Sequence, residues 1–168
     1  MNFMLQLVVM VVLVQQGNNM DLMRFTGIAK EIAKLSKDKS TQVGALVIDD
    51  DGNLLSTGFN GFPRGVLDHE FRYADRSIKL KYISHAESNA IAQAARNGVR
   101  LKGSNLLLTA LYPCENCAKL IIQAGIKRIY APVMGDEANR QWHEERRYSS
   151  IMFHEAGVEV IEYDGGNQ

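Results

Sequence analysis

A chain of 168 residues, of which 46% are hydrophobic and 23% charged, has the composition of one ordinary globular domain with its own core. Its 19 basic residues balance its 19 acidic ones, so the composition argues against a stable duplex nucleic-acid binder and favours a small substrate. Two cysteines three positions apart are also too few and too close for a disulfide framework.

The apolar N-terminus fits neither a membrane span nor a secretory signal. The run from 3 to 14 is apolar apart from one glutamine, whereas a membrane-spanning helix needs about 20 such residues. A signal peptide would begin with a basic region, but the first basic residue is Arg24. Either Met20 is the true start of the chain, or residues 1–19 are an extra segment that packs on a neighbouring subunit. We therefore expect a cytoplasmic protein with no membrane association.

The rest of the chain alternates strand-like and helix-like segments. Apolar residues at helical spacing predict an amphipathic helix over 21–36. The later elements, in chain order, are strands over 42–48 and 53–59 joined by a turn, a loop over 60–69, a short helix over 71–81, a helix over 84–97, a strand over 105–109, a helix over 113–124, a strand over 128–131, a helix over 136–155 and a strand over 158–163.

This order predicts an α/β fold, a three-layer α/β/α arrangement around a five-stranded mixed sheet. The domain is expected to span residues 20–164. Residues 165–168 are expected to form a frayed tail after it.

Two short motifs fall at the starts of predicted helices that are separated by one strand. His85-Ala86-Glu87 begins the first helix, and Pro113-Cys114-Glu115-Asn116-Cys117 begins the second. A right-handed crossover would place the two helices side by side on one face of the sheet with their N-termini together. The two motifs are therefore expected to form one site.

The residue types at these helix starts suit a zinc ion. Unpaired N–H groups and partial positive charge at a helix N-terminus lower the pKa of nearby thiols, here those of Cys114 and Cys117. Cysteines at i and i+3 lie on one face of a helical turn, and His85 would complete three protein ligands. Three ligands leave a fourth tetrahedral position for water, which is typical of a catalytic rather than a structural zinc site.

Glu87 lies two residues after His85, where it could not easily join the same ion without crowding. Beside the water it could take a proton and return it to the substrate ring and the leaving amine. The order H-x-E…P-C-x-x-C is the signature of zinc base deaminases. The alternatives for the cysteine pair are a thioredoxin-like redox pair and a plain structural zinc site, but the conjunction of ligand count, order and spacing favours the deaminase.

Four stretches resemble the deoxycytidylate (dCMP) deaminases of the cytidine deaminase-like superfamily. They are an opening strand motif at Thr41–Ala45, a substrate loop at Gly58–Gly65, a zinc helix at His85–Ile91 and a second zinc helix at Leu111–Ile126. The resemblance extends over about residues 21–163. It implies hydrolytic deamination of dCMP to dUMP by a homo-oligomer, a hexamer or a dimer. It also implies an allosteric site for a nucleotide, with Mg²⁺ as a candidate ion.

The resemblance further implies that Asn60 contacts the nucleotide, and Arg64 in the same loop is a second candidate. Relatives with a second zinc use additional cysteines, and this chain has none to spare, so we expect one Zn²⁺ per subunit. Family members often carry a tyrosine near the substrate phosphate, soon after the strand that follows the second zinc helix. Here the stretch 131–136 has none, and Arg140, Trp142 and Tyr148 are alternatives that the sequence does not separate.

Two other functions share the zinc motif. A tRNA adenosine deaminase or other nucleobase deaminase would need a basic groove and room for a flipped base, against which the neutral composition argues. A zinc protein that only senses nucleotides would be free to lose Glu87, which this chain retains. Both remain alternatives to a dCMP deaminase.

Overall fold

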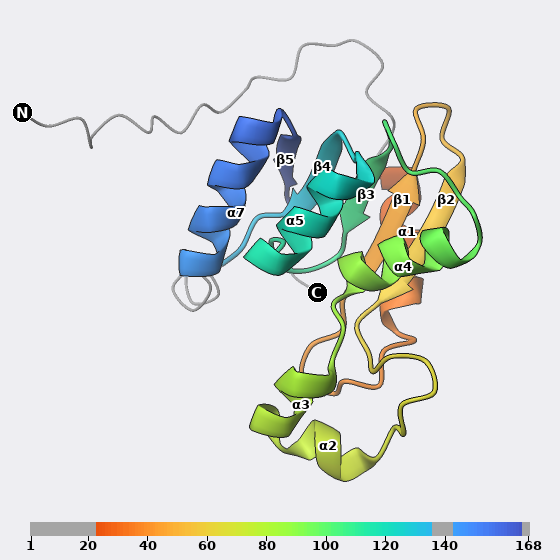
Figure 1. Ribbon diagram of the computed structural model, residues 1–168, viewed down its shortest axis with the longest axis vertical. Coiled ribbons are helices and arrows are strands. Elements are labelled where there is room, and N and C mark those ends of the chain that lie inside the picture. The colour runs from red at the N-terminus through yellow and green to blue at the C-terminus, as the bar shows by residue number, and fades with distance from the viewer. Residues whose placement is uncertain (1–22, 136–142, 166–168) are drawn as a thin grey trace, which may run out of the picture.

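The computed structural model describes residues 23–135 and 143–165 (Figure 1). At its centre lies a five-stranded sheet in the order β2-β1-β3-β4-β5. Strand β1 (Gly44–Ile48) pairs antiparallel with β2 (Leu54–Phe59) and with β3 (Asn105–Leu108). Strands β4 (Arg128–Pro132) and β5 (Glu159–Tyr163) continue the sheet in parallel from β3. The predicted mixed sheet of five strands is confirmed.

Helices cover both faces of the sheet, as predicted (Figure 1). Side chains alternate between the faces of a strand, and those of β1 do so here. Leu46 and Ile48 pack with Ala29 of α1 (Met23–Ala33) on one face. Ala45 and Val47 belong to the larger core on the other face. That core is covered by three helices, which are α4 (Ala86–Arg96), α5 (Glu115–Ala124) and α7 (His143–Ala156).

A glycine in β2 lets the start of α4 lie directly against the sheet. A Cβ atom added at Gly58 would come within 2.2 Å of the Ala86 carbonyl oxygen and 2.4 Å of the Ala90 backbone nitrogen. Any side chain there would push the helix away, because real Cβ contacts are never that short. The first turn of α4, which carries the His85-Ala86-Glu87 motif, is thereby held at a fixed height above the sheet.

The helix predicted over 71–81 is two helices, α2 (Glu70–Ala74) and α3 (Arg76–Tyr82). Asp75 interrupts the prediction because its backbone is extended and its carboxylate accepts hydrogen bonds from the backbone nitrogens of Ser77 (2.8 Å) and Ile78 (3.2 Å). Asp75 is therefore the N-cap of a new helix. The two short helices form a lobe that projects from the sandwich beneath the start of α4 (Figure 1).

Several predictions fall on residues outside the described ranges, namely the segment 1–19, Arg140, Trp142, the first seven residues of the helix predicted over 136–155 and the tail beyond residue 165. They stay predictions. Within the described ranges, no helix combines the length and the apolarity that crossing a membrane requires.

Candidate active site

His85 stands immediately before α4 as its N-cap residue. Its backbone is extended, and its side chain makes no capping bond to the helix, which leaves the imidazole free to point elsewhere. The preceding residue, Ser84, forms a two-way backbone bridge with Gly61, with N···O distances of 2.8 and 3.0 Å. This bridge ties the loop after β2 to the segment that positions the histidine.

The cysteines occupy the start of α5 in the same manner. Cys114 is the N-cap residue with an extended backbone and no side-chain cap, and Cys117 is buried in the first turn. Ahead of them Leu111 adopts a left-handed conformation with φ of 61°, which is unusual for a branched side chain and turns the chain from β3 into α5. Such backbone conformations concentrate at functional sites.

The structure brings the three predicted ligands together. The His85 Nδ1 atom lies 3.4 Å from the Cys114 Sγ atom and 3.5 Å from the Cys117 Sγ atom, and all three ligand atoms lie within 4.8 Å of one another. Zn–N and Zn–S bonds of about 2.1 and 2.3 Å place tetrahedral ligand atoms about 3.6 Å apart. The two distances from His85 to the cysteines match this separation, so two thiols and an imidazole placed in this way suit a zinc ion.

The two thiols ionise differently in the metal-free protein. A hydrogen bond from Cys117, helped by one from His85, lowers the pKa of Cys114 to about 4. The same bond with Cys114, together with burial, raises the pKa of Cys117. The hydrogen bond with Cys114 also raises the pKa of His85. One thiolate is therefore ready for a cation, whereas the second thiol must release its proton when a metal binds.

Glu87 lies in the first turn of α4 and only 6% of its surface is exposed. Burial is the main reason that the pKa of its carboxyl group is raised, and the positive charge of His85 opposes the change. A carboxyl group whose pKa is raised holds a proton more readily, so it can return to a substrate the proton that it has accepted. Glu87 is therefore suited to proton transfer beside the ligand cluster.

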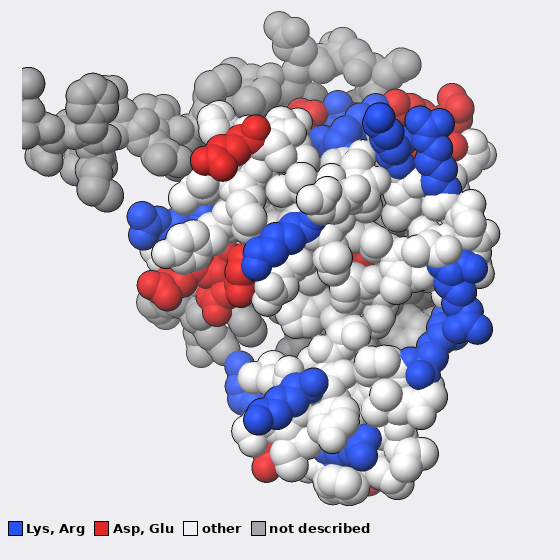
Figure 2. Space-filling view, in the orientation of Figure 1, with Lys and Arg blue, Asp and Glu red and all other residues white. Residues whose placement is uncertain are grey.

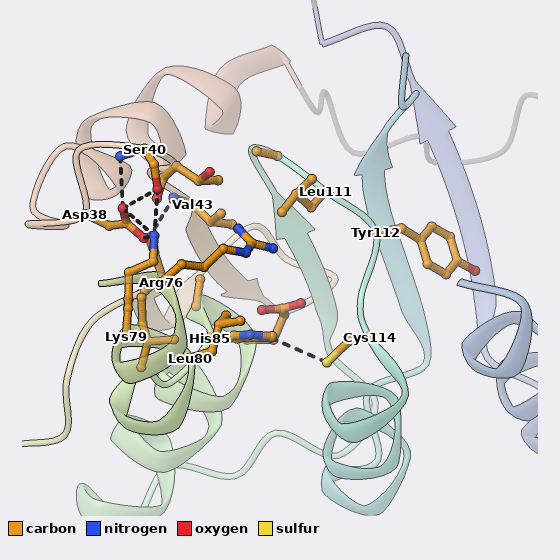
Figure 3. A pocket seen from close by; sticks show the side chains of 16 residues that line it. Asp38, Ser40, Val43, Arg76, Lys79, Leu80, His85, Leu111, Tyr112 and Cys114 are labelled. Atoms are coloured by element: carbon orange, nitrogen blue, oxygen red, sulfur yellow. Dashed lines mark hydrogen bonds and ion pairs between the residues drawn. The ribbon is translucent and has the colours of Figure 1, made fainter. Parts of the chain in front are cut away.

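A pocket opens above this cluster (Figure 3). Its walls come from four parts of the chain, and its lining includes more apolar than charged side chains. The lining residues are Asp38, Ser40, Thr41, Val43, Asn60, Arg76, Lys79, Leu80, Ile83, His85, Ala86, Glu87, Ala110, Leu111, Tyr112 and Cys114. Glu87 and two of the three metal-ligating candidates, His85 and Cys114, thus line one cavity, and Cys117 is buried next to them.

Asn60 lines the pocket, and its amide group also braces the pocket wall. Its Oδ1 atom accepts a hydrogen bond from the Val43 backbone (2.8 Å), and its Nδ2 atom donates one to the Thr41 carbonyl oxygen (2.8 Å). An amide has two lone pairs and two N–H donors, so one of each is left over for a ligand. Asn60 can therefore shape the wall and contact a substrate at the same time.

Arg64 and Tyr148 lie away from this cavity. Arg64 is exposed and donates a hydrogen bond to the side chain of Gln93 on α4, and Tyr148 is 56% exposed on α7. Neither side chain is part of the pocket lining.

Sequence reasoning missed four polar residues of the pocket, Asp38, Ser40, Arg76 and Lys79. The only hint in the sequence is the i, i+3 spacing of Arg76 and Lys79, which places both side chains on one face of a helix.

Residues 20–133 match the sequence profile of the cytidine and deoxycytidylate deaminase zinc-binding region. A protein of Aliivibrio fischeri described as an uncharacterized deaminase in the luxG 3′ region is 43% identical over 137 residues, covering 82% of this chain and 89% of that protein. The deoxycytidylate deaminase of Mus musculus is 38% identical over 139 residues, covering 80% of this chain and 74% of the mouse protein.

Solved structures show the same fold. The dCMP deaminase of the cyanophage S-TIM5, in complex with dCMP and dUMP, superposes with a TM-score of 0.66 at 27% sequence identity. The superposition covers 84% of this chain and 96% of the phage chain. The likeness therefore extends well beyond the zinc-binding motifs.

Proposed function

The chain belongs to the cytidine and deoxycytidylate deaminase family, and from that premise we propose that it catalyses the zinc-dependent hydrolytic deamination of dCMP to dUMP. The observation that carries the proposal is the convergence of His85, Cys114 and Cys117 at the floor of a pocket that His85, Cys114 and the buried Glu87 line. Relatives named deoxycytidylate deaminases and a similar structure solved with dCMP and dUMP support the choice of substrate.

The reaction replaces the 4-amino group of cytosine with an oxygen atom from water and releases ammonia. A zinc ion held by His85, Cys114 and Cys117 would supply the Lewis acidity that makes water nucleophilic at neutral pH. Glu87 takes a proton from the attacking water and delivers it to the ring nitrogen N3. It then carries the second proton to the departing amine, so that water and cytosine become uracil and ammonia.

The apolar walls and Asn60 orient the ring for this attack. Val43, Ala86 and Leu111 line the cavity around the ligand cluster, and they exclude bulk water from the reacting carbon. The amide of Asn60 is held by two backbone hydrogen bonds and therefore presents its remaining donor and acceptor in a fixed direction. We propose that these remaining groups contact the nucleotide.

The charge balance supports a small substrate rather than a polynucleotide. The chain carries 19 basic and 19 acidic residues, without the basic surplus that is typical of proteins that bind nucleic acid. Figure 2 shows the basic side chains of one face mainly at its upper right and along its right edge, with mostly uncharged side chains over its centre. A tRNA adenosine deaminase is thus the weaker alternative.

A substrate panel tests the proposal. Purified zinc-loaded protein should release ammonia from dCMP, and the rates on dCTP, CMP and deoxycytidine should be lower. An RNA stem-loop with an adenosine in its loop serves as the competing substrate. Deamination of that RNA without any of dCMP would replace the proposal by the alternative.

We further propose a cytoplasmic homo-oligomer, a hexamer or a dimer. The family resemblance supports this proposal. Light scattering on the purified protein would give the subunit number. An allosteric nucleotide bound with Mg²⁺ stays a prediction from the family resemblance.

A further inference from the structure

Three basic side chains line the pocket, and two of them already have partners. His85 contacts both cysteines in the ligand cluster. Lys79 is buried, and its Nζ atom lies 2.9 and 3.1 Å from the two carboxylate oxygens of Asp38 and 2.7 Å from the Ser40 hydroxyl oxygen. An ammonium group has three N–H donors, so these contacts use all of them. Lys79 therefore has no donor left for a ligand.

The third basic side chain is Arg76, which lies one helical turn before Lys79 on α3. Within residues 23–135 and 143–165, no hydrogen bond or ion pair engages its guanidinium group. Figure 3 shows the side chain extending from α3 across the pocket, with the guanidinium directed inward instead of toward Asp38. Arg76 thus brings an uncompensated positive charge and five N–H donors into the cavity.

The neighbouring contacts keep Arg76 at this place. The Asp38–Lys79 ion pair is more than 90% buried at both side chains and fastens α3 to the segment before β1. Asp75 caps the helix immediately before Arg76. The backbone of Arg76 is therefore fixed on both sides, while its side chain stays free to reach a ligand.

Neither of the two acidic residues that line the pocket neutralises Arg76, so an anionic ligand could do so. Asp38 is neutralised by Lys79, and Glu87 lies at the ligand cluster. A planar guanidinium matches the oxygens of a phosphate with paired hydrogen bonds, which an ammonium group does not.

We infer that Arg76 binds the 5′-phosphate of the nucleotide and gives the enzyme its preference for a nucleotide over a nucleoside. This inference rests on the proposed function. Family members often carry a tyrosine near the substrate phosphate after β4, and residues 131–136 of this chain have none, so the inference assigns phosphate binding to α3 instead. Arg76 is then a specificity-determining residue that contacts substrate but takes no part in the chemistry at the ring.

The test compares dCMP with deoxycytidine in the wild type and in Arg76→Ala. Loss of a charge-assisted phosphate contact should reduce kcat/KM for dCMP by about 10- to 100-fold, chiefly through KM, and leave kcat/KM for deoxycytidine within about threefold. Arg76→Lys keeps the positive charge but lacks the planar guanidinium group, so its kcat/KM for dCMP should lie between those of the wild type and of Arg76→Ala. Lys81→Ala removes a positive charge from the same helix outside the pocket and is the matched control, expected to behave as the wild type.

Isothermal titration with dUMP and with deoxyuridine gives a second measurement that does not depend on turnover. In Arg76→Ala the affinity for dUMP should fall by the same factor, while that for deoxyuridine stays unchanged. Equal losses for nucleotide and nucleoside, or no loss for either, would overturn the inference. Wild-type protein that converts no dCMP would instead overturn the proposed function, whatever the variant does.

Discussion

The ligand cluster and the rim of the pocket are built in different ways. His85, Cys114 and Cys117 lie at the starts of α4 and α5, and the packing of these two helices on the sheet brings the three side chains together. The rim, by which we mean the pocket residues Asp38, Ser40, Arg76 and Lys79, depends on the short helix α3. The buried ion pair between Lys79 and Asp38 holds this helix in place. We therefore propose that the sheet fixes the chemistry, whereas the lobe of α2 and α3 carries recognition and can vary without disturbing the metal.

Changes at the ligand cluster should therefore abolish the reaction for every substrate. Cys117→Ala removes one of three metal ligands and leaves two, so zinc content and activity on both dCMP and deoxycytidine should be lost together. Metal analysis beside the ammonia assay measures both quantities. A Cys117→Ala protein that retains one zinc per subunit would show that Cys117 is not a ligand.

Glu87→Ala should separate the metal from the proton transfer. The variant keeps all three ligands, so zinc content should match that of the wild type, while kcat falls by at least ~10²-fold because the general acid and base is gone. Glu87→Gln keeps the size of the side chain and serves as its control for packing. Unchanged turnover in either variant would remove Glu87 from the mechanism.

Lys79→Met should lower the free energy of unfolding, because it breaks the buried ion pair that holds α3, and it should leave the zinc content unchanged. It strands the buried Asp38 without its partner, which costs about 3–5 kcal/mol of unfolding free energy at neutral pH. Lys39→Ala breaks the exposed Lys39–Glu70 pair and should change stability little, which makes it the matched control. Denaturant unfolding measures both, and equal effects of the two variants would contradict the structural role given to the buried pair.

The contribution of the Asp38–Lys79 ion pair to stability should depend on pH. Burial opposes the charge on Asp38, but hydrogen bonds from Ser40 and Lys79 outweigh it and lower the pKa of the carboxyl group. The stabilisation from a group whose pKa is lowered on folding is present above its unfolded value near 4 and is lost as the pH falls through the lower folded value. The stability difference between wild type and Lys79→Met should therefore shrink below about pH 4, and a difference that grows there would contradict this account.

The smallest effect is expected from Ser40→Ala. The Ser40 hydroxyl bonds both Asp38 and Lys79, and its loss leaves Lys79 with two of its three acceptors. The free energy of unfolding should fall by about 1 kcal/mol. KM for dCMP should rise a few-fold, because Arg76 is held less firmly, with zinc content unchanged. A changed zinc content would mean that the rim and the ligand cluster are not separable.

The difference between the two regions also explains what the sequence could predict. The three candidate metal ligands and Glu87 are encoded in two short motifs at helix starts, and the alternation of strands and helices brings those starts together. Asp38 and Lys79 are 41 positions apart, and no local pattern announces that they pair.

The pattern of apolar residues also could not predict the helix break at Asp75 or the direction of the Arg64 side chain. The break at Asp75 depends on a capping side chain, a signal that is present in the sequence as an aspartate two residues before Ser77. The loop of Arg64 resembles a substrate loop, yet its arginine turns outward to Gln93 because the tertiary fold, and not the local sequence, sets its direction.

Activity at graded zinc occupancy tests the central claim most directly. Metal is removed with a chelator, zinc is returned in steps, and ammonia release from dCMP is measured at each step together with bound zinc. The account predicts that the rate rises in proportion to bound zinc and reaches its maximum at one zinc per subunit, with one ammonia formed per dUMP. A rate independent of zinc content, or zinc-loaded protein that releases no ammonia from dCMP, would contradict it.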